Sequence, residues 1–246
     1  MAGKFDKSHG CRLFYPSLIC GLLLLVPRPA RALEGFKFVS QQTVSAQAPV
    51  AMAALGRQKG FAAYDKDAGD LLFLDRNFAE IGRVKLHDAL GYNLKELCCL
   101  TFDAARQRIV AFDAGRKLLL SIQPDGKVER TTSLDIRAPV SFSTPTGMTI
   151  DSDGTVYIAD RGENDIKVFS ADGIFLYAIN LPLDVEGEKP RFCVTALAVL
   201  GDGSLAAIDS KARNIVLFSR EGRFISERPL EGEYAEIRKI MALESG

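Results

Sequence analysis

Tryptophan is absent from the 246-residue sequence, and histidine occurs only twice. Only His87 lies beyond residue 32, so a zinc site, which usually takes three protein ligands, is all but excluded. No C-x-x-C pair, G-x-S-x-G elbow or P-loop is present, which removes common redox, hydrolase and nucleotide-binding motifs. No second apolar run of membrane length follows the N-terminal region.

The first 32 residues have the composition of a secretory leader. Lys4, Lys7 and Arg12 precede the apolar stretch Leu13–Pro27, and a small-residue A-x-A site ends at Ala32. This order is typical of a cleaved signal peptide. The apolar stretch is also too short to span a bilayer as a helix. We therefore expect segment 1–32 to be removed and segment 33–246 to be periplasmic or secreted, without membrane insertion. An uncleaved anchor is the alternative.

Charge of either sign is not in excess, since 31 basic residues balance 31 acidic ones. The leader carries five basic residues and one acidic residue, so the remainder has a net charge of about −4. Nucleic acid and anionic membrane surfaces bind concentrated basic faces. The charge therefore argues against both as partners.

Three cysteines follow the leader, namely Cys98, Cys99 and Cys193. An odd number cannot pair completely within one chain. Cys98 and Cys99 lie in the apolar run LCCLTF, where neighbouring side chains of a strand point to opposite faces. We expect buried free thiols; a vicinal or intermolecular disulfide is the alternative that an exported compartment permits.

A short apolar run that ends in aspartate occurs four times. The aspartates are Asp65, Asp113, Asp160 and Asp209, at spacings of 48, 47 and 49 residues. Self-similarity at such a period is typical of a solenoid or a propeller. A second repeated feature is an acidic residue followed by glycine, at Gly126, Gly173 and Gly222.

The segment 145–180 contains four short runs of β-branched and aromatic residues separated by turn residues. This pattern predicts a meander of four antiparallel strands, with Gly154 and Gly173 supplying the positive φ of tight turns. Such a unit leaves both faces apolar, so packing of successive units around an axis is expected. A β-sandwich is the competing arrangement. The only helical pattern, at Asn93–Leu100, is too short to build a layer.

The stretch from Pro145 to Gly173 resembles an NHL repeat, with a P-x-G opening, a D-x-D-G turn, VYIAD, IKVF and a D-G turn. The segment 194–222 resembles it less fully. The resemblance implies an all-β propeller of four-stranded antiparallel blades. For activity it implies little, because NHL propellers serve as binding scaffolds, lyases and lactonase-like enzymes.

The repeats and the remaining termini predict the number of blades. The chain segments left over at both ends, 33–48 and 234–246, would combine into one closing blade, which removes exposed strand edges. We predict five blades; a six-bladed or open form is the alternative. The predicted repeats span 49–85, 96–134, 145–180 and 194–229.

The repeated aspartates are interpreted as structural, because each can accept backbone N–H groups of the following turn. Asp151-Ser-Asp153-Gly154 opens like a calcium loop but lacks an acidic residue at the twelfth position, so a hairpin turn is favoured. We therefore expect no cofactor. A divalent cation such as calcium is the alternative, since the lactonase-like propellers carry one.

Long connectors between the repeats are the remaining candidates, because loops on a rigid scaffold carry most binding residues. Their candidate residues are Tyr92, Phe142, Asp184, Glu186 and Arg191. Aromatic and arginine side chains are common interface anchors. We predict an exported, non-catalytic binding or scaffold module whose partner is another exported or membrane-associated protein. The alternative is a divalent-metal-dependent lactonase-like hydrolase or lyase.

Overall fold

The structure is a computed structural model, and it describes residues 20–25, 40–42, 49–56, 59–135, 139–183, 190–230 and 237–242. Four successive groups of strands each form a four-stranded antiparallel meander, called here blades 1 to 4. Blade 1 contains β3 (Pro49–Ala54), β4 (Phe61–Asp65), β5 (Asp70–Leu74) and β6 (Glu80–Lys85). Blade 2 contains β7 (Leu97–Asp103), β8 (Arg108–Asp113), β9 (Leu118–Ile122) and β10 (Val128–Ser133). Blade 3 contains β11 (Pro145–Ile150), β12 (Val156–Asp160), β13 (Asp165–Phe169) and β14 (Phe175–Asn180). Blade 4 contains β15 (Val194–Val199), β16 (Leu205–Asp209), β17 (Asn214–Phe218) and β18 (Phe224–Pro229).

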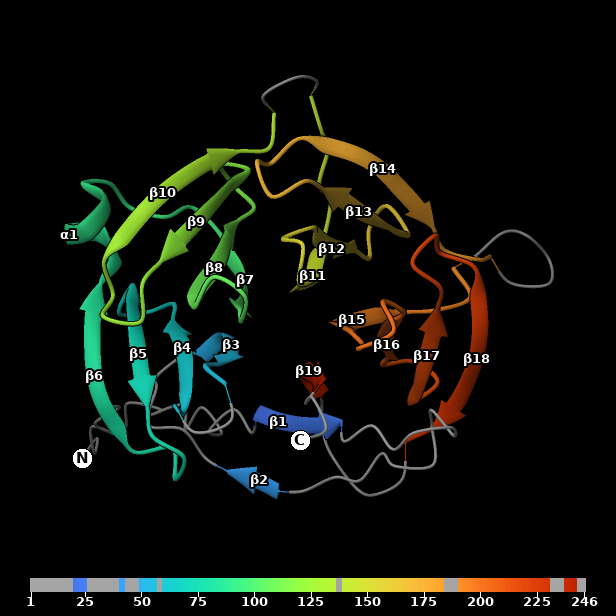
Figure 1. Ribbon diagram of the computed structural model, residues 1–246, viewed down its shortest axis with the longest axis horizontal. Helices are drawn as coiled ribbons and strands as arrows, with labels where there is room; N and C mark the ends of the chain where they lie inside the picture. Colours follow the sequence, from blue (N-terminus) through green and yellow to red (C-terminus); the bar gives the residue numbers. More distant parts are fainter. Residues whose placement is uncertain are drawn as a thin grey trace, which may run out of the picture.

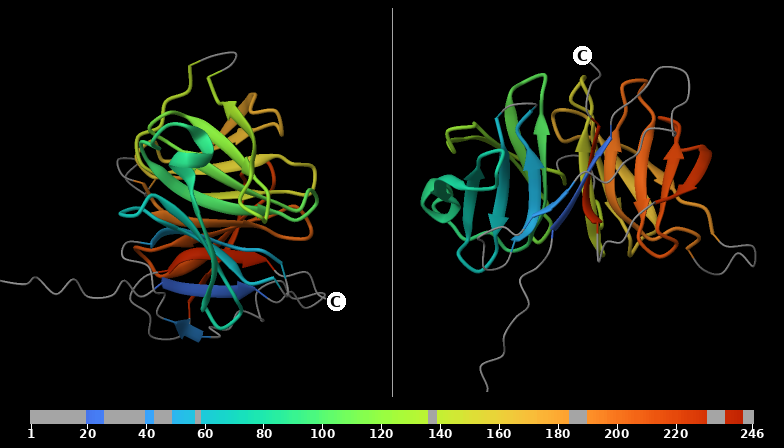
Figure 2. Two further views of the ribbon diagram at one scale, coloured as in Figure 1. Left: turned by 90° about the vertical axis from the view of Figure 1, so that its left-hand side faces the viewer. Right: turned by 90° about the horizontal axis from the view of Figure 1, so that it is seen from below.

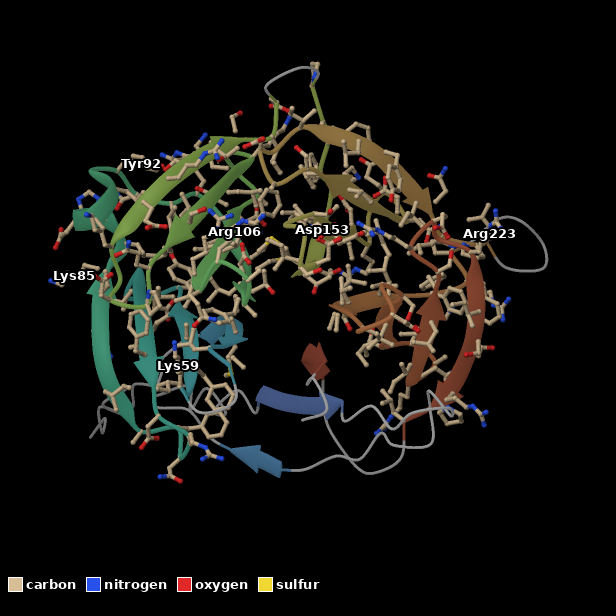
Figure 3. The ribbon with its side chains drawn as sticks, in the orientation of Figure 1. Lys59, Lys85, Tyr92, Arg106, Asp153 and Arg223 are labelled. Atoms are coloured by element: carbon tan, nitrogen blue, oxygen red, sulfur yellow. The ribbon has the colours of Figure 1, made fainter. Side chains whose placement is uncertain are left out.

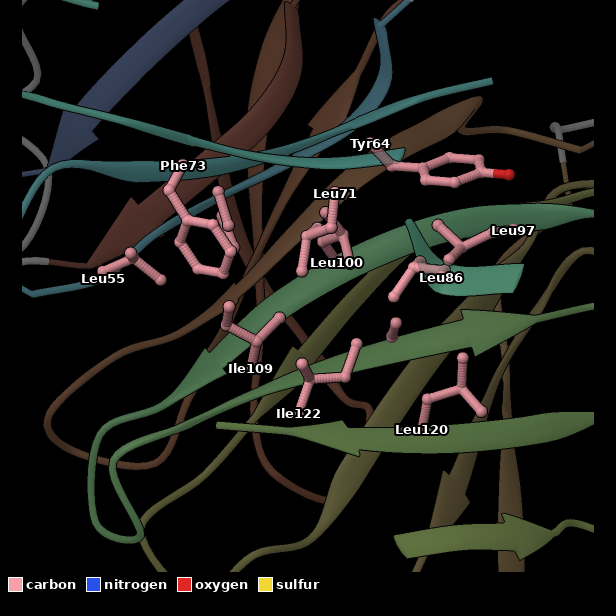
Figure 4. Close-up of a cluster of buried hydrophobic side chains, with 13 residues drawn as sticks. Leu55, Tyr64, Leu71, Phe73, Leu86, Leu97, Leu100, Ile109, Leu120 and Ile122 are labelled. Atoms are coloured by element: carbon pink, nitrogen blue, oxygen red, sulfur yellow. The ribbon is translucent and has the colours of Figure 1, made fainter. Parts of the chain in front are cut away.

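The blades stand around a common axis, with their first strands innermost (Figure 1). Strands such as β12 and β13 are buried at every residue, because each blade is covered on both faces by its neighbours. The outermost strands are mostly exposed. Figure 4 shows the cluster between blades 1 and 2, where Leu71, Leu100 and Ile109 are fully or almost fully buried. Burial of each such side chain contributes about 2 kcal/mol.

A three-stranded sheet lies between blade 4 and blade 1, in the order β19 (Ile237–Ala242), β1 (Cys20–Leu25) and β2 (Ser40–Gln42). β19 lies beside β15, as β15 lies beside β11 (Figure 1). Strands from both terminal regions therefore share a sheet. However, β1 separates β2 from β19, and it runs parallel to β19 although all pairs within the blades are antiparallel. Four complete blades are described, and β1 belongs to the segment that the sequence assigns to the leader.

The turn glycines at 126, 173 and 222 lie where each blade closely approaches the preceding one. Their φ angles are +90°, +77° and +84°, a region that favours glycine. A Cβ atom on Gly222 would also lie 2.1 Å from Cγ2 of Ile179 in blade 3. Gly126 meets Val84 of blade 1 in the same way. Close approach between blades, and not turn geometry alone, therefore requires these glycines.

The one helix of the described residues, α1 (Leu86–Leu90), lies in the connector between blades 1 and 2 (Figure 2). The helical pattern at Asn93–Leu100 does not form a helix, because Leu97–Asp103 pairs with β8 as the inner strand of blade 2. Among the described residues, no helix has the length and apolar character needed to cross a bilayer.

Candidate functional site

The repeated aspartates fix one end of the ring, as Asp160 shows. Its carboxylate accepts N–H groups of Gly162 at 3.0 Å and Glu163 at 3.3 Å in the following turn. It also accepts the N–H groups of Ser143 and Thr144, both at 2.7 Å, from the connector that enters blade 3. The second pair of bonds holds the incoming connector to blade 3. The sequence could indicate only the turn, since the connector lies 16 and 17 residues earlier.

The equivalent aspartates dock the other connectors. Asp113 accepts the N–H of Glu96 at 2.9 Å, and Asp209 accepts the N–H of Cys193 at 3.0 Å. Asp65 accepts N–H groups of its own turn. The connectors and these turns therefore form one face of the ring, in which backbone positions are fixed by buried carboxylates.

The three predicted connector residues that the structure describes, Tyr92, Phe142 and Arg191, lie in three different connectors. Tyr92 lies near the outer rim of the ring, with the guanidinium of Arg116 at 4.9 Å from its ring centroid (Figure 3). Phe142 packs between Phe112 and Phe169, at centroid distances of 4.8 and 6.2 Å, and so fills the gap between blades 2 and 3. Packing explains this residue without a ligand.

Arg191 lies at the entry to blade 4. Its guanidinium stacks on Phe192 at 4.9 Å and Phe224 at 5.0 Å, and it donates to Glu227 at 3.1 Å. Two of these three partners, Phe224 and Glu227, belong to the outer strand β18. Asp184 and Glu186 lie outside the described residues.

A cavity of about 480 Å³ opens on the axis of the ring, at the end where the inner strands begin. Its walls come from β3, β7, β11 and β15, with Met52, Cys98, Thr146 and Thr195 among the lining residues. All four inner strands have a bulge near their first residues, which turns these positions toward one another. Repeated bulges next to a cavity are a feature that the sequence pattern did not reveal.

Charged side chains surround the mouth of this cavity. Lys66, Lys95 and Arg161 are exposed and line it together with Glu96, and we call the three cations the cationic rim. Lys66 and Arg161 directly follow repeated aspartates, whereas blade 2 has Ala114 at that position. No salt bridge of these three cations is found within residues 51–56, 59–135, 139–183 and 190–230. Their charge is therefore available to an anionic group.

Cys98 and Cys99 do not point to opposite faces, contrary to the expectation for a regular strand. Their Sγ atoms lie 3.1 Å apart, because the bulge between Leu97 and Cys99 interrupts the alternation. The hydrogen bond shared with Cys99, and then burial, raise the pKa of Cys98 well above 9.0. Both cysteines, like Cys193, are free thiols.

Blade 3 contains a buried charge cluster at the same end. Lys167 lies 2.6 Å from Asp165 and 3.6 Å from Asp160. Burial raises the pKa of Asp165 above 3.8 despite this bond. For Asp160, burial opposes ionisation, but N–H bonds from Thr144 and Ser143 and the charge of Lys167 outweigh it and lower the pKa. The two carboxyl groups differ because Asp160 accepts four backbone N–H groups in addition to the charge of Lys167.

The opposite end of the ring holds latches between blades. Asp151 accepts N–H groups of Asp153 and Thr155 within its own hairpin turn and the guanidinium of Arg220 in blade 4 at 3.1 Å. Burial, followed by the Asp151 charge, raises the pKa of Tyr157 to about 12. The segment that opens like a calcium loop is therefore a hairpin that ties blades 3 and 4.

Arg106 of blade 2 makes a similar latch, donating to the backbone carbonyl of Asp153 in blade 3 at 2.9 Å (Figure 3). No group of three histidine, cysteine, aspartate or glutamate side chains placed to hold a metal occurs in the part of the chain that the structure describes. Blades, axial cavity and inter-blade latches together define a protein of the β-propeller class.

Residues 142–169 match the NHL repeat family model, so this propeller carries an NHL repeat in blade 3. No curated protein matches the chain at a significant level. The motifs that indicated this repeat in the sequence, from the P-x-G opening to IKVF, lie within or next to the matched residues.

Several solved structures share the fold. A streptogramin B lyase structure is 17% identical, with a TM-score of 0.51 over 77% of this chain and 57% of that chain. A protein of unknown function from Bacteroides caccae is 12% identical, with a TM-score of 0.52 over 78% and 65%. The hydrazine synthase of Kuenenia stuttgartiensis is 14% identical, with a TM-score of 0.50 over 80% and 53%. The chain spans a little over half the length of most of these structures, which indicate the fold alone.

Proposed function

We propose that this protein is an exported, non-catalytic binding module, and that it holds an acidic segment of another exported or membrane-associated protein. The observation that carries the proposal is the cationic rim around the axial cavity. Lys66, Lys95 and Arg161 come from three different segments and meet at one opening. Three cations against the single carboxylate of Glu96 leave an excess of positive charge at this opening. Such an excess around a concave surface steers an oppositely charged partner and fixes its position.

The surrounding structure supports a rigid binding face. Asp113 accepts the backbone N–H of Lys95, and the backbone N–H of Arg161 donates to the carbonyl of Thr144, so these two rim residues sit on hydrogen-bonded backbone. The rim is exposed and the cavity is open at the end of the ring, which suits a chain segment better than a small, enclosed substrate. The net charge of the chain near −4 after the predicted cleavage makes this cationic surface local.

The proposal is tested by reversing the rim charges in the variant K66E/K95E/R161E. A matched control, K59E/K127E/R223E, reverses three exposed cations at the opposite end of the ring. The tagged chain is used to capture partners from envelope extracts of its native host. We expect wild type and control to retain the same salt-sensitive partner and the rim variant to weaken its binding at least about tenfold. Equal binding by the rim variant would refute the proposal.

The alternative function is a divalent-metal-dependent lactonase-like hydrolase or lyase. One of the solved structures that share the fold is a lyase, so this alternative also needs a test. Metal analysis of the purified protein distinguishes the two. About one calcium or zinc ion per chain, removable by a chelator with loss of thermal stability, would favour the enzyme over the binding module.

Export and ring closure complete the proposal. N-terminal sequencing of the exported protein should give a start at Leu33; a start at Met1 in the membrane fraction would overturn the proposed cleavage.

We further propose five blade positions, supported by β19 lying beside β15 as a fifth inner strand. A chain that begins at Leu33 would keep β2 and β19 but not β1, so the closing sheet would have to pair differently after cleavage.

A further inference from the structure

The cavity wall departs from the repeat most clearly in blade 2. At the bulge of each inner strand the residue pairs are Val50-Ala51, Cys98-Cys99, Thr146-Gly147 and Thr195-Ala196. The second residue is small in every blade, but only blade 2 carries two thiols. The structural requirement of the bulge is met without sulfur in three blades, so it does not explain the cysteine pair.

The two thiols lie close enough together to bind one metal ion jointly. The bulge brings Sγ of Cys98 and Sγ of Cys99 to 3.1 Å on the same side of the strand, and both residues line the axial cavity. Met148 of β11 lines the cavity too, and it packs in the same apolar cluster as the two cysteines. Two thiols and the methionine of an adjacent blade therefore line the same cavity and share one apolar cluster.

We propose that Cys98, Cys99 and Met148 form a binding site for a soft, thiophilic metal ion, and that monovalent copper is the ion they fit. Thiolate and thioether ligands select Cu(I), whereas calcium and magnesium require oxygen ligands. Zinc is a poorer match, since its structural sites take four nitrogen, sulfur or carboxylate ligands. Thioether sulfur is not among those ligands.

Binding needs no electron transfer. Two thiols and one Cu(I) ion give a dithiolate complex of charge −1, and two protons leave to solvent, while Met148 contributes a neutral lone pair. The cationic rim lies around the same cavity and offsets the charge of the complex. This site is separate from the proposed partner-binding role, because it uses the wall of the cavity and not its rim.

The test uses the full exported chain, reduced and kept without oxygen, and Cu(I) supplied as its complex with bathocuproine disulfonate. The wild type should take one Cu(I) per chain from this chelator. C98S and C99A should each lower the affinity at least about a hundredfold, since loss of a ligand exceeds the ~10–100-fold typical of outer-shell changes. M148L should lower it less than either thiol variant does, because the thioether is a neutral ligand.

Two matched variants serve as controls. C193S removes the third thiol, and M52L alters the other methionine of the cavity wall; both should bind Cu(I) as the wild type does. Unchanged thermal unfolding without copper shows that C98S, a substitution at a partly buried position, is folded. The proposal is overturned if the reduced wild type takes no stoichiometric Cu(I), if C98S retains its affinity, if C193S loses it equally, or if Zn(II) displaces the copper.

Discussion

Blades 3 and 4 have the same strand order and register, yet they fill the centre of their third strands in opposite ways. Lys167 is the third residue of β13, and Val216 is the third residue of β17; they lie opposite Ile158 and Ala207. Lys167 is 4% exposed and Val216 is 0% exposed. The same buried position of the repeat therefore accepts either a charged or an apolar side chain.

The difference depends on what surrounds each site. Lys167 has two carboxylates, Asp160 and Asp165, and lies 5.4 Å from the ring of Phe142. In blade 4 the position of Asp165 is taken by Asn214, so Val216 lacks the second carboxylate. A buried lysine is tolerated only with such partners, because an unpaired buried charge is costly. The comparison teaches that the repeat fixes the backbone, while charge is balanced within each blade.

The largest effect is expected on removing the carboxylate that both holds the connector and neutralises the lysine. D160A should destabilise the protein by about 4 kcal/mol, since Lys167 loses a partner and four N–H groups lose an acceptor. D209A in blade 4 removes backbone bonds only and should cost about 2 kcal/mol. Urea unfolding of both variants measures the difference, and equal losses would contradict the role given to Lys167.

The effect of D160A should also depend on pH. The folded-state pKa of Asp160 is lowered below 3.8, so its stabilisation is complete above about pH 4 and is lost as the pH falls through the lowered value. The free-energy gap between wild type and D160A should therefore narrow at about pH 2.5 compared with about pH 7. A constant gap would show that the carboxylate charge contributes nothing.

A second experiment tests whether blade 4 tolerates a buried lysine at Val216, the position equivalent to Lys167. V216K should destabilise the protein by about 3 kcal/mol, because Asp209 alone cannot compensate a buried ammonium group. Adding N214D restores the second carboxylate and should recover about half of this loss. Thermal and urea unfolding of the single and double variants give the coupling energy. If the effects of V216K and N214D are additive, the two side chains do not interact, and the balance of charge within the blade is refuted.

The smallest effect is expected when blade 3 is given the residues of blade 4. D165N/K167V replaces a buried ion pair by a neutral amide and an apolar side chain, a change that is often neutral or stabilising. We expect a free energy of unfolding within about 1 kcal/mol of wild type. K167V alone leaves two buried carboxylates and should be clearly less stable. If the double variant is as unstable as K167V, the cluster has a further role.

The arrangement of the site could be predicted only in part. The connectors were a reasonable source of binding residues, but Phe142 proved to be a packing residue between Phe112 and Phe169. Lys66 and Arg161 could have been noticed as cations that directly follow two of the four aspartates. Lys95 could not, because its place at the cavity depends on how Asp113 docks the connector through the N–H groups of Lys95 and Glu96.

The sequence by itself determined the four-stranded antiparallel units, because apolar runs, turn glycines and a period near 48 residues are local signals. Tertiary structure alone decided which side chains meet on the axis, how β1 enters the closing sheet, and that Cys98 and Cys99 face the same way. These features arise from bulges and from packing between segments distant in the chain. A single-residue shift of register reverses side-chain direction, and no local pattern encodes it.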